Sequence, residues 1–290
     1  RVCSLWLKPF GSSHLAQATL AQERDTARHC TALLAMRVVV VPVLSDNYAY
    51  LLIDDTTKEA AAVDPAEAHL VLAKVVEEGV KLTSVLTTHH HYDHSGGNGE
   101  VAAKIPSIKV YGGALDDVAA CTHPLNHGDE VIVGSLKVLA LHTPGHTRGS
   151  ISYYCAEADQ QVVFTGDTLF VGGCGRIFES TPAELYHSLT EVLGRLPATT
   201  QVYVGHEYTV KNLEFAASVE KGGDNEPLQQ MLEWAKQQKV QRKFTVPSTL
   251  QNEWLINPFM RSGTDQMKGT CPGCSPVEVF AKLRRQKDRF

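Results

Sequence analysis

The sequence predicts a mixed, layered α/β domain followed by a helical region. Between residues 37 and 210, short β-rich segments follow one another and are interrupted by two amphipathic helical patterns. Beyond Val210 the strand pattern disappears and helical patterns replace it. The segment Val133-Gly134-Ser135-Leu136 is typical of a hairpin, so the sheets are not purely parallel. We therefore divide the chain into an extension of residues 1–36, an α/β domain of residues 37–210 and a helical domain of residues 211–290.

Residues 1–36 differ in composition from the rest of the chain. They contain four basic residues, several Ser and Thr, and no clear strand pattern, which is weakly typical of an organelle transit peptide. Glu23 and Asp25 count against that interpretation. Met36 stands directly before the first predicted strand and could start a shorter form. We therefore expect a cytoplasmic location, with a mitochondrial form as the alternative.

The α/β domain is predicted from its alternating elements. Its strands are short and apolar: Val38–Leu44, Tyr48–Ile53, Ala60–Val63, Ser84–Thr88, Lys109–Tyr111, Glu130–Val133, Leu136–Leu141, Ile151–Tyr154, Val162–Thr165 and Gln201–Val204. Two helices interrupt them. Ala66–Glu78 ends at Gly79, and Thr181–Leu193 opens with Thr-Pro and ends at Gly194. This alternation favours mixed, layered sheets over a doubly wound sheet.

The last eighty residues have the pattern of helices joined by a long connection. The predicted helices are Leu213–Val219, Pro227–Gln238 and Pro276–Asp288, and a Pro-containing stretch lies around Val246 to Pro258. The final helix carries a basic run, Lys282 to Lys287. Taken alone, such a run is usually a solvated helix face.

The composition argues against a membrane protein and against a nucleic-acid backbone binder. With 43% hydrophobic and 20% charged residues, the chain resembles an ordinary globular protein, and no apolar run reaches the length of a membrane span. A net charge of −5 argues against a nucleic-acid backbone binder. The seven cysteines are expected to be reduced thiols. Cys271-Pro-Gly-Cys274 has half the spacing of a zinc site, but no second pair follows, so we expect unpaired loop thiols there.

The strongest motif is Thr88-His89-His90-His91-Tyr92-Asp93-His94, which directly follows an apolar strand. Imidazole and carboxylate groups are the donors that borderline divalent ions prefer. His89, His91, Asp93 and His94 are therefore candidate ligands, whereas alternation turns His90 aside. Four donors in six residues cannot all close around one tetrahedral ion without strain. The spacing therefore suggests two metals that share the loop.

Further donors appear after later strands, each next to a glycine: His146, Asp167 and His206. Any one of them alone is more often a turn residue, but together with the loop they make a metal centre. The remaining histidines have no companions at metal spacing and are expected to be ordinary polar residues: His14, His29, His69, His123, His127, His142 and His187.

The ordered set HxHxDH, then His, Asp and His after successive strands, is similar to that of the metallo-β-lactamase superfamily. The resemblance covers about residues 37–210 and implies an αββα sandwich. It implies two ligand sets: His89, His91 and His146 for one metal, and Asp93, His94 and His206 for the other, with Asp167 bridging. The antibiotic-hydrolysing members carry Cys at the bridging position. Asp64 matches an early Asp of the superfamily and is expected to orient a ligand; a strand-ending turn residue is the alternative.

Within the superfamily the chain resembles glyoxalase II, the hydroxyacylglutathione hydrolases, over nearly everything after Arg37. The resemblance is carried by Ser45-Asp46-Asn47-Tyr48, Leu86 to His94, Gly166 to Phe170, Gly173-Cys174-Gly175-Arg176, Gly205-His206-Glu207-Tyr208-Thr209, Thr245-Val246-Pro247-Ser248-Thr249-Leu250 and Asn257-Pro258-Phe259-Met260-Arg261. The last two segments lie outside the common fold of the superfamily and make the resemblance specific.

This resemblance implies hydrolysis of S-D-lactoylglutathione, and of related S-2-hydroxyacylglutathiones, to D-lactate or its analogue and glutathione. A hydroxide held between two divalent ions would attack the thioester carbonyl, with Asp93 and Asp167 as catalytic residues. Zinc is the expected metal, and the same ligands accept iron or manganese. The implied substrate-binding residues are Arg176, Phe178, Tyr208, Arg284 and Lys287.

Three positions depart from the family pattern. Phe178 stands where some relatives have Tyr, so one hydroxyl contact would be missing. Ser180 replaces a Gly, and Ser150 stands where many relatives have His. We expect a monomer that acts on a small molecule, with no nucleic-acid or membrane partner. The alternatives are a mono-iron persulfide dioxygenase of the same fold and a non-catalytic binder of glutathione conjugates.

Overall fold

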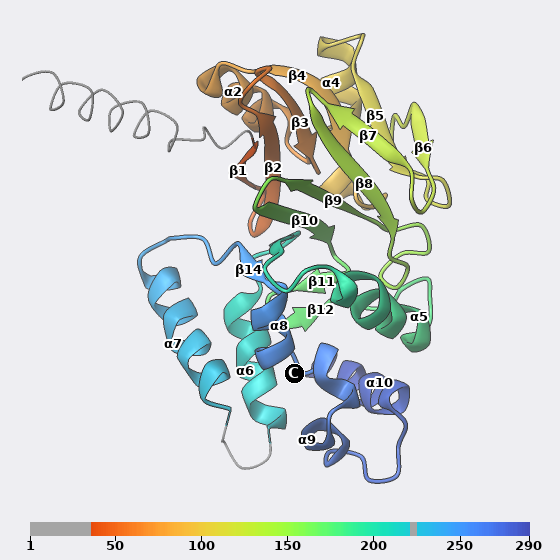
Figure 1. Ribbon diagram of the computed structural model, residues 1–290, viewed down its shortest axis with the longest axis vertical. Helices are drawn as coiled ribbons and strands as arrows, with labels where there is room; N and C mark the ends of the chain where they lie inside the picture. Colours follow the sequence, from red (N-terminus) through yellow and green to blue (C-terminus); the bar gives the residue numbers. More distant parts are fainter. Residues whose placement is uncertain (1–35, 221–224) are drawn as a thin grey trace, which may run out of the picture. The chain divides into compact units, whose positions relative to one another are not determined.

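The computed structural model describes residues 36–220 and 225–290, which belong to one compact unit, Met36–Phe290 (Figure 1). The transit-peptide prediction therefore lies, apart from Met36, outside the described residues. Within the described ranges, no helix has both the length and the apolar character needed to cross a membrane.

Two six-stranded sheets form the centre of the fold. The first sheet has the order β1 (Met36–Val43), β2 (Asn47–Asp54), β3 (Glu59–Val63), β4 (Lys81–Leu86), β5 (Lys109–Gly113) and β6 (His123–Leu125). The second has the order β14 (Ser248–Thr249), β13 (Gln201–Val204), β10 (Gln160–Gly166), β9 (Ile151–Glu157), β8 (Leu136–His142) and β7 (Glu130–Val133). Both contain parallel and antiparallel pairs, as predicted. A hairpin of β11 (Leu169–Phe170) and β12 (Gly173–Cys174) lies beside the second sheet.

Helices cover the outer faces of the two sheets. Those near the first sheet are α2 (Ala68–Glu78), α3 (Tyr92–Ser95) and α4 (Asn98–Lys104). Those beyond the second sheet are α5 (Pro182–His187), α6 (Thr209–Val219), α7 (Glu226–Val240), α8 (Leu250–Ile256), α9 (Asp265–Lys268) and α10 (Pro276–Lys287). A π-helical turn, Ser188–Val192, and a 3-10 turn, Leu193–Arg195, extend α5, and another 3-10 turn spans Met260–Gly263.

Alternating side chains of the strands build three cores. Tyr50 and Leu52 of β2 face the second sheet, while Leu51 and Ile53 face α2 and α4. In the same way, Phe164 of β10 points between the sheets and its neighbour Val163 packs toward the C-terminal helices. Because both faces of each sheet are covered, these strands are apolar throughout. The result is the αββα arrangement of the metallo-β-lactamase fold, followed by a helical region.

Every strand and helix predicted from the sequence is present, with ends that shift by a few residues. Elements of only a few residues were not predicted: α3, α9, β6, β11, β12 and β14. The longer α4 and α8 were also missed. The strand β14 corrects the prediction that no strand follows Val210, because Val202 of β13 pairs with Ser248. The predicted domain boundary between residues 210 and 211 stays a prediction.

The prediction of unpaired thiols at Cys271 and Cys274 is wrong, because the two form a disulfide. A turn with Gly273 at φ +81° brings their Cα atoms to 5.6 Å, a separation that a disulfide can span. Cys121, Cys155 and Cys174 are free thiols, as predicted. Cys3 and Cys30 lie outside the described residues.

Candidate metal centre

The seven candidate ligands all follow the ends of strands on one edge of the sandwich. They are His89, His91, Asp93 and His94 after β4, His146 after β8, Asp167 after β10 and His206 after β13. The short helix α3 explains how one loop supplies four donors. His91 is its N-cap residue, and Asp93 and His94 lie within its only turn, where the His94 ring lies beside that of His89 with the ring centres 4.2 Å apart.

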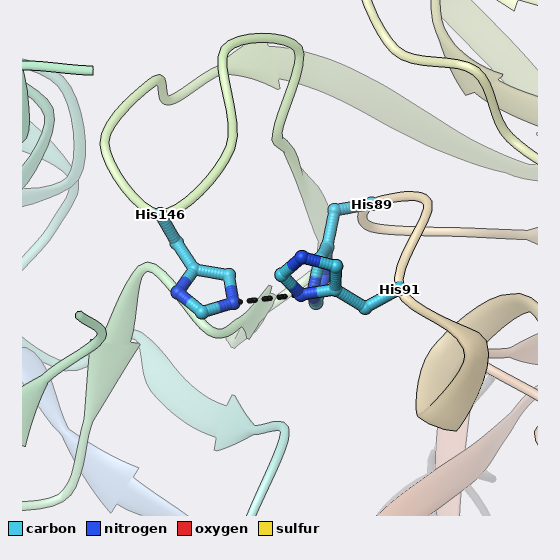
Figure 2. A group of neighbouring side chains, drawn as sticks. All are labelled: His89, His91 and His146. Atoms are coloured by element: carbon cyan, nitrogen blue, oxygen red, sulfur yellow. Dashed lines mark hydrogen bonds between the residues drawn. The ribbon is translucent and has the colours of Figure 1, made fainter. Parts of the chain in front are cut away.

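Three histidines form the first group. Figure 2 shows His146 approaching from the loop between β8 and β9, and His89 and His91 from the loop after β4. His91 Nδ1 lies 3.0 Å from His89 Nε2 and 3.0 Å from His146 Nε2. The ring nitrogens of these three residues all lie within 4.8 Å of one another, a spacing suited to a single cation.

A second group lies beside the first and shares Asp167 with it. Asp93 Oδ2 is 3.3 Å from His206 Nε2 and 3.7 Å from His94 Nε2. The Asp167 carboxylate reaches both groups: Oδ1 is 3.2 Å from His94 Nε2, and Oδ2 is 3.4 Å from His206 Nε2 and 3.5 Å from His146 Nε2. All seven side chains are therefore brought together, with Asp167 between the two groups.

Two buried atoms in this centre indicate that the residues suit a divalent cation. His94 Nε2 and Asp167 Oδ1 lie buried 3.2 Å apart, and apart from this contact neither atom has a hydrogen-bond partner within the described ranges. Burying an unsatisfied polar atom costs about 1–3 kcal/mol, so such atoms are rare without a reason. Imidazole nitrogens and carboxylate oxygens are also the donors that zinc and related ions take. The donor set and these two sparsely bonded buried atoms both fit a metal site.

The opposite sides of the rings are held by hydrogen bonds. His94 Nδ1 lies 2.9 Å from Asp64 Oδ2, and the same carboxylate accepts from the backbone and side chain of Thr88. His206 Nδ1 lies 3.0 Å from Asp46 Oδ1, and His146 Nδ1 lies 2.8 Å from the carbonyl oxygen of Arg176. Such partners fix the orientation and tautomer of a ligating ring.

Sequence reasoning missed Asp46 and Asn47 as members of the site. Asn47 Nδ2 donates to the side chain and the backbone carbonyl of Asp93. Both residues stand in the Ser45-Asp46-Asn47-Tyr48 segment that carries part of the family resemblance, so that segment was the available signal. Their contacts with the centre span 46 and 160 residues of sequence, which no local pattern reveals.

The histidines of the two groups differ in pKa: those of the first group have lowered values and those of the second group have raised values. Burial, followed by neighbouring histidines, lowers the pKa of His89 and of His91. Burial also lowers the pKa of His206, but Asp167 and Asp93 outweigh it and raise that pKa to about 10. The pKa of His94 is raised for the same reason by Asp167 and Asp64. Without metal, the second group therefore holds imidazolium–carboxylate pairs, and the first group holds neutral rings.

An open pocket of about 760 Å³ leads to the centre. It is lined by His91, Asp93, His146, Asp167 and His206 and by all five predicted substrate-binding residues, Arg176, Phe178, Tyr208, Arg284 and Lys287. The Tyr208 ring stacks on His206 with the ring centres 4.6 Å apart. Phe178 is 60% exposed, and its ring meets His146 edge-on at 5.1 Å.

The two cations of α10 that line the pocket, Arg284 and Lys287, differ in their surroundings. The Arg284 guanidinium is buried, where it donates to the carbonyl oxygen of Cys174 and pairs with Asp288. Much of its bonding capacity therefore holds the β11–β12 hairpin. The Lys287 ammonium donates to the carbonyl oxygen of Lys211 and lies over the rings of Phe215 and Phe290. Burial, followed by the charge of Arg284, lowers the pKa of Lys287 to about 8.

The other histidines are not part of either ligand group. His90 turns away from the centre, and its Nδ1 lies 2.6 Å from Asp116 Oδ1. His142 and His127 contact each other on the surface, where the His142 backbone N–H donates to His127 Nδ1. His69, His123 and His187 belong to no group of metal-type donors. His14 and His29 lie outside the described residues.

Comparisons with known proteins agree with this architecture. The model of the metallo-beta-lactamase superfamily matches residues 44–206, and the model described as "Hydroxyacylglutathione hydrolase C-terminus" matches residues 207–290. The chain is 48% identical over 258 residues to a protein of Arabidopsis thaliana named "Hydroxyacylglutathione hydrolase cytoplasmic", covering 88% of this chain and 99% of that one. It is 40% identical to "Hydroxyacylglutathione hydrolase" of Dictyostelium discoideum, with coverages of 88% and 100%.

Among solved structures, the chain is similar to ETHE1 from Myxococcus xanthus. The TM-score is 0.63 at 30% sequence identity, and the match covers 86% of this chain and 89% of that one. A B3 metallo-beta-lactamase, BLEG-1, matches with a TM-score of 0.59 at 24% identity, covering 77% and 99% of the two chains, which shows the shared fold alone.

Proposed function

The chain belongs to the hydroxyacylglutathione hydrolases of the metallo-beta-lactamase superfamily, and from this premise we propose that it hydrolyses S-D-lactoylglutathione and related S-2-hydroxyacylglutathiones to the 2-hydroxy acid and glutathione. One observation carries the proposal. Seven imidazole and carboxylate donors converge at a pocket whose wall also presents Arg176, Tyr208 and Lys287. The pocket therefore combines the donors for divalent metal with cations suited to an anionic substrate.

We propose a dinuclear centre with zinc as the metal. His89, His91 and His146 would hold one ion, Asp93, His94 and His206 would hold the other, and Asp167 would bridge them. Bound there, divalent ions supply Lewis acidity and bring the pKa of a water close to neutrality. Asp64 would orient His94, as Asp46 would orient His206, through their hydrogen bonds to Nδ1.

The protein's own carboxylates would align the attacking water. Asp167 and Asp93 both line the pocket with carboxylate oxygens, and either can accept a hydrogen bond from a water directed at the thioester carbonyl. Asn47 holds the Asp93 side chain from behind. No Ser or Cys nucleophile is assigned. Cys174 lines the pocket, but burial raises the pKa of its thiol to about 11, which disfavours a thiolate.

The glutathione part of the substrate would lie along the pocket wall formed by the end of β12 and by α10. Glutathione carries two carboxylates, and Arg176 and Lys287 offer charge-assisted hydrogen bonds to them. Tyr208 and Phe178 flank the entrance to the metal donors. Arg284 would contribute mainly by holding the loop that carries Arg176, because its guanidinium donates to the carbonyls of Cys174 and Gly175.

A turnover assay combined with metal analysis tests the proposal. The wild-type chain should release free thiol from S-D-lactoylglutathione and contain two divalent ions per chain. Asp167→Ala should lose activity by more than roughly 100-fold, since even partners outside the ligand shell are worth 10–100-fold. The matched control is Asp159→Ala, which changes an exposed carboxylate in the turn between β9 and β10 and should leave both readings unchanged.

The same assay separates the alternatives. Binding of the substrate without release of thiol would favour a non-catalytic binder of glutathione conjugates. Oxygen consumption with one iron per chain would favour a persulfide dioxygenase. The match of residues 207–290 to the hydroxyacylglutathione hydrolase C-terminus supports the hydrolase.

We also propose that the protein acts as a monomer on a small molecule, without a nucleic-acid or membrane partner. A cytoplasmic location is proposed by analogy with the Arabidopsis relative, whose name contains that word. A mitochondrial form is the alternative, and imaging of the full chain beside a chain starting at Met36 distinguishes the two.

A further inference from the structure

A buried carboxylate outside the ligand set joins the two loops that carry the histidines of the first group. Asp116 lies in the loop after β5, and its side chain is only 2% exposed. Asp116 Oδ2 accepts hydrogen bonds from the His90 backbone N–H at 3.0 Å and from Thr147 Oγ1 at 3.2 Å. Asp116 Oδ1 lies 2.6 Å from His90 Nδ1.

The partners of Asp116 are the immediate neighbours of three candidate ligands. His90 stands between His89 and His91, and Thr147 directly follows His146. One carboxylate therefore joins the His90 backbone to the Thr147 side chain. The loops also approach closely here, because a Cβ atom added at Gly149 would lie 2.5 Å from the backbone nitrogen of Asp116. Only a glycine allows that approach.

His90, Asp116 and Glu179 could in principle hold a cation themselves, because their donor atoms lie within 4.8 Å of one another. Their hydrogen bonds argue otherwise. Both oxygens of Asp116 and Nδ1 of His90 are already engaged, and Glu179 Oε2 accepts from the Arg148 backbone N–H. Glu179 Oε1 lies 3.5 Å from His90 Nε2, so the group extends to the loop beside Phe178. Asp116, His90 and Thr147 therefore tie the two loops together, and we call these three residues the clamp.

We propose that Asp116 is a positioning residue for the first metal: it holds the loops of His89, His91 and His146 at the separation that one cation requires, without touching the cation. The inference rests on the metal centre proposed above. Two loops that are ordered before metal binds lose less conformational entropy when it binds. Loss of the clamp should therefore weaken metal affinity at the group of His89, His91 and His146. The metal affinity of the group of Asp93, His94 and His206 should stay unchanged.

The test compares two substitutions that each neutralise a buried carboxylate. Asp116→Asn places an amide N–H₂ against the donors of His90 and Thr147. The matched control is Asp54→Asn: Asp54 is fully buried and accepts hydrogen bonds from Thr57 and Ser135, away from the centre. Zinc affinity is measured by competition with a chromophoric chelator, and the site that fills is followed by the absorption of bound cobalt.

In Asp116→Asn, we expect one of the two zinc affinities to fall by roughly 10–100-fold and the other to stay unchanged. Asp54→Asn should lower the melting temperature of the metal-free protein and leave both affinities unchanged. Thr147→Val removes one of the three hydrogen bonds and should weaken the same site by a smaller factor. It keeps the inference testable if Asp116→Asn is too unstable to purify.

Two unchanged affinities in Asp116→Asn, or an equal loss in Asp54→Asn, would overturn the inference and leave the proposed hydrolase intact. A wild-type chain that binds fewer than two ions would overturn the proposed dinuclear centre and the clamp together.

Discussion

At the scale of single residues, the charge state of the metal-free centre determines how it takes up metal. His94 and His206 have raised pKa values because Asp167 and its neighbouring carboxylates attract their protons. The pKa of Asp167 is held well below its ordinary value by these two histidines, against the effect of burial. The protons that stabilise the empty centre must leave before the imidazole nitrogens can bind metal.

We therefore expect metal binding to release protons at pH 7. The pKa of His206, about 10, means that its ring is protonated at that pH, so lower pH favours the metal-free form and metal affinity should fall as pH falls. Calorimetric titration with zinc in two buffers of different ionisation enthalpy counts the protons. His127→Gln, which changes an exposed histidine outside the centre, should give the wild-type count; a wild-type count of zero would contradict the expectation.

Phe178 offers a second residue-scale prediction, because it lines the pocket at a position where the family resemblance leads us to expect a Tyr in some relatives. Its ring is exposed and packs edge-on against His91 and His146, so an added hydroxyl would point into solvent or toward bound substrate. Phe178→Tyr should lower KM for S-D-lactoylglutathione by roughly 2- to 10-fold, the value of one net hydrogen bond, and leave kcat unchanged. Steady-state kinetics check this, and an unchanged KM would rule the contact out.

Lys287 should make substrate binding sensitive to alkaline pH. Its pKa is about 8, so the ammonium is charged at pH 7 and loses its charge as pH rises through 8. KM should rise over that range by roughly 10-fold, because a hydrogen bond to a charged group is worth about 1.5–3 kcal/mol. KM is measured from pH 6.5 to 9.5. Lys287→Arg keeps its charge throughout and should flatten the profile, whereas Lys287→Ala should raise KM at every pH.

At the scale of elements, α8 fastens the β11–β12 hairpin that precedes Arg176. Glu253 accepts hydrogen bonds from the backbone N–H of Gly172 and from Ser248, and Asn257 donates to the carbonyl oxygens of Phe170 and Gly173. Asn257 belongs to the Asn257–Arg261 segment, which lies outside the common superfamily fold. The Asn257–Arg261 segment, which is typical of the family, therefore supports the wall of the pocket.

This network predicts a pH-dependent stability. Burial raises the pKa of Glu253 from 4.5 to about 7, so the folded state binds its proton more tightly than the unfolded state. The stability that this proton contributes is complete below pH 4.5 and is lost as pH rises through 7. Its magnitude is up to about 3 kcal/mol.

Glu253→Gln keeps the shape of the neutral carboxyl group and should remove that component. The free energy of unfolding is measured with urea between pH 4.5 and 7.5. We expect the wild type to lose stability relative to Glu253→Gln as pH rises, and the exposed Glu233→Gln on α7 to follow the wild type. Parallel curves for the wild type and Glu253→Gln would contradict the raised pKa.

Short elements explain most of what was not predicted at this scale. The helix α3 has four residues, too few for a helical period, yet it carries Asp93 and His94 of the metal centre. The strand β14 has two residues and forms only because the edge of β13 is available to it. Both depend on surroundings that a local pattern does not contain.

At the scale of the whole molecule, the second sheet depends on the C-terminal helices. Val163 and Val202 on its outer face share a core with Phe259, Phe280 and Leu283 of the last segments, all of which are buried. Burial of each such side chain contributes about 1.5–3 kcal/mol, a large part of a typical folding free energy.

A chain that ends at Val210 should therefore not fold on its own. It would expose the apolar outer face of the second sheet and lose the pairing of β13 with β14. Circular dichroism, a hydrophobic dye and urea unfolding compare it with a chain of residues 36–290, which contains the whole compact unit and should unfold cooperatively. Cooperative unfolding of the shorter chain would instead support two independent domains divided near residue 210.

The sequence by itself determined the kinds of donor, their order along the chain and the strands that they follow. It also predicted the mixed sheets, because the apolar patterns and turn residues that encode them are local. The motif around His89 is equally local, since a strand end and a short loop suffice to present it.

Only the tertiary structure decided which groups meet. Asp46 reaches His206 across 160 residues because packing of the two sheets brings their loops to one edge. Asp116 reaches His90 across 26 residues because β4 and β5 are neighbours in the first sheet. Packing of the C-terminal helices against the second sheet buries Arg284 against the Cys174 carbonyl. Contacts of this kind depend on the summed burial of many distant side chains, so no short stretch of sequence contains them.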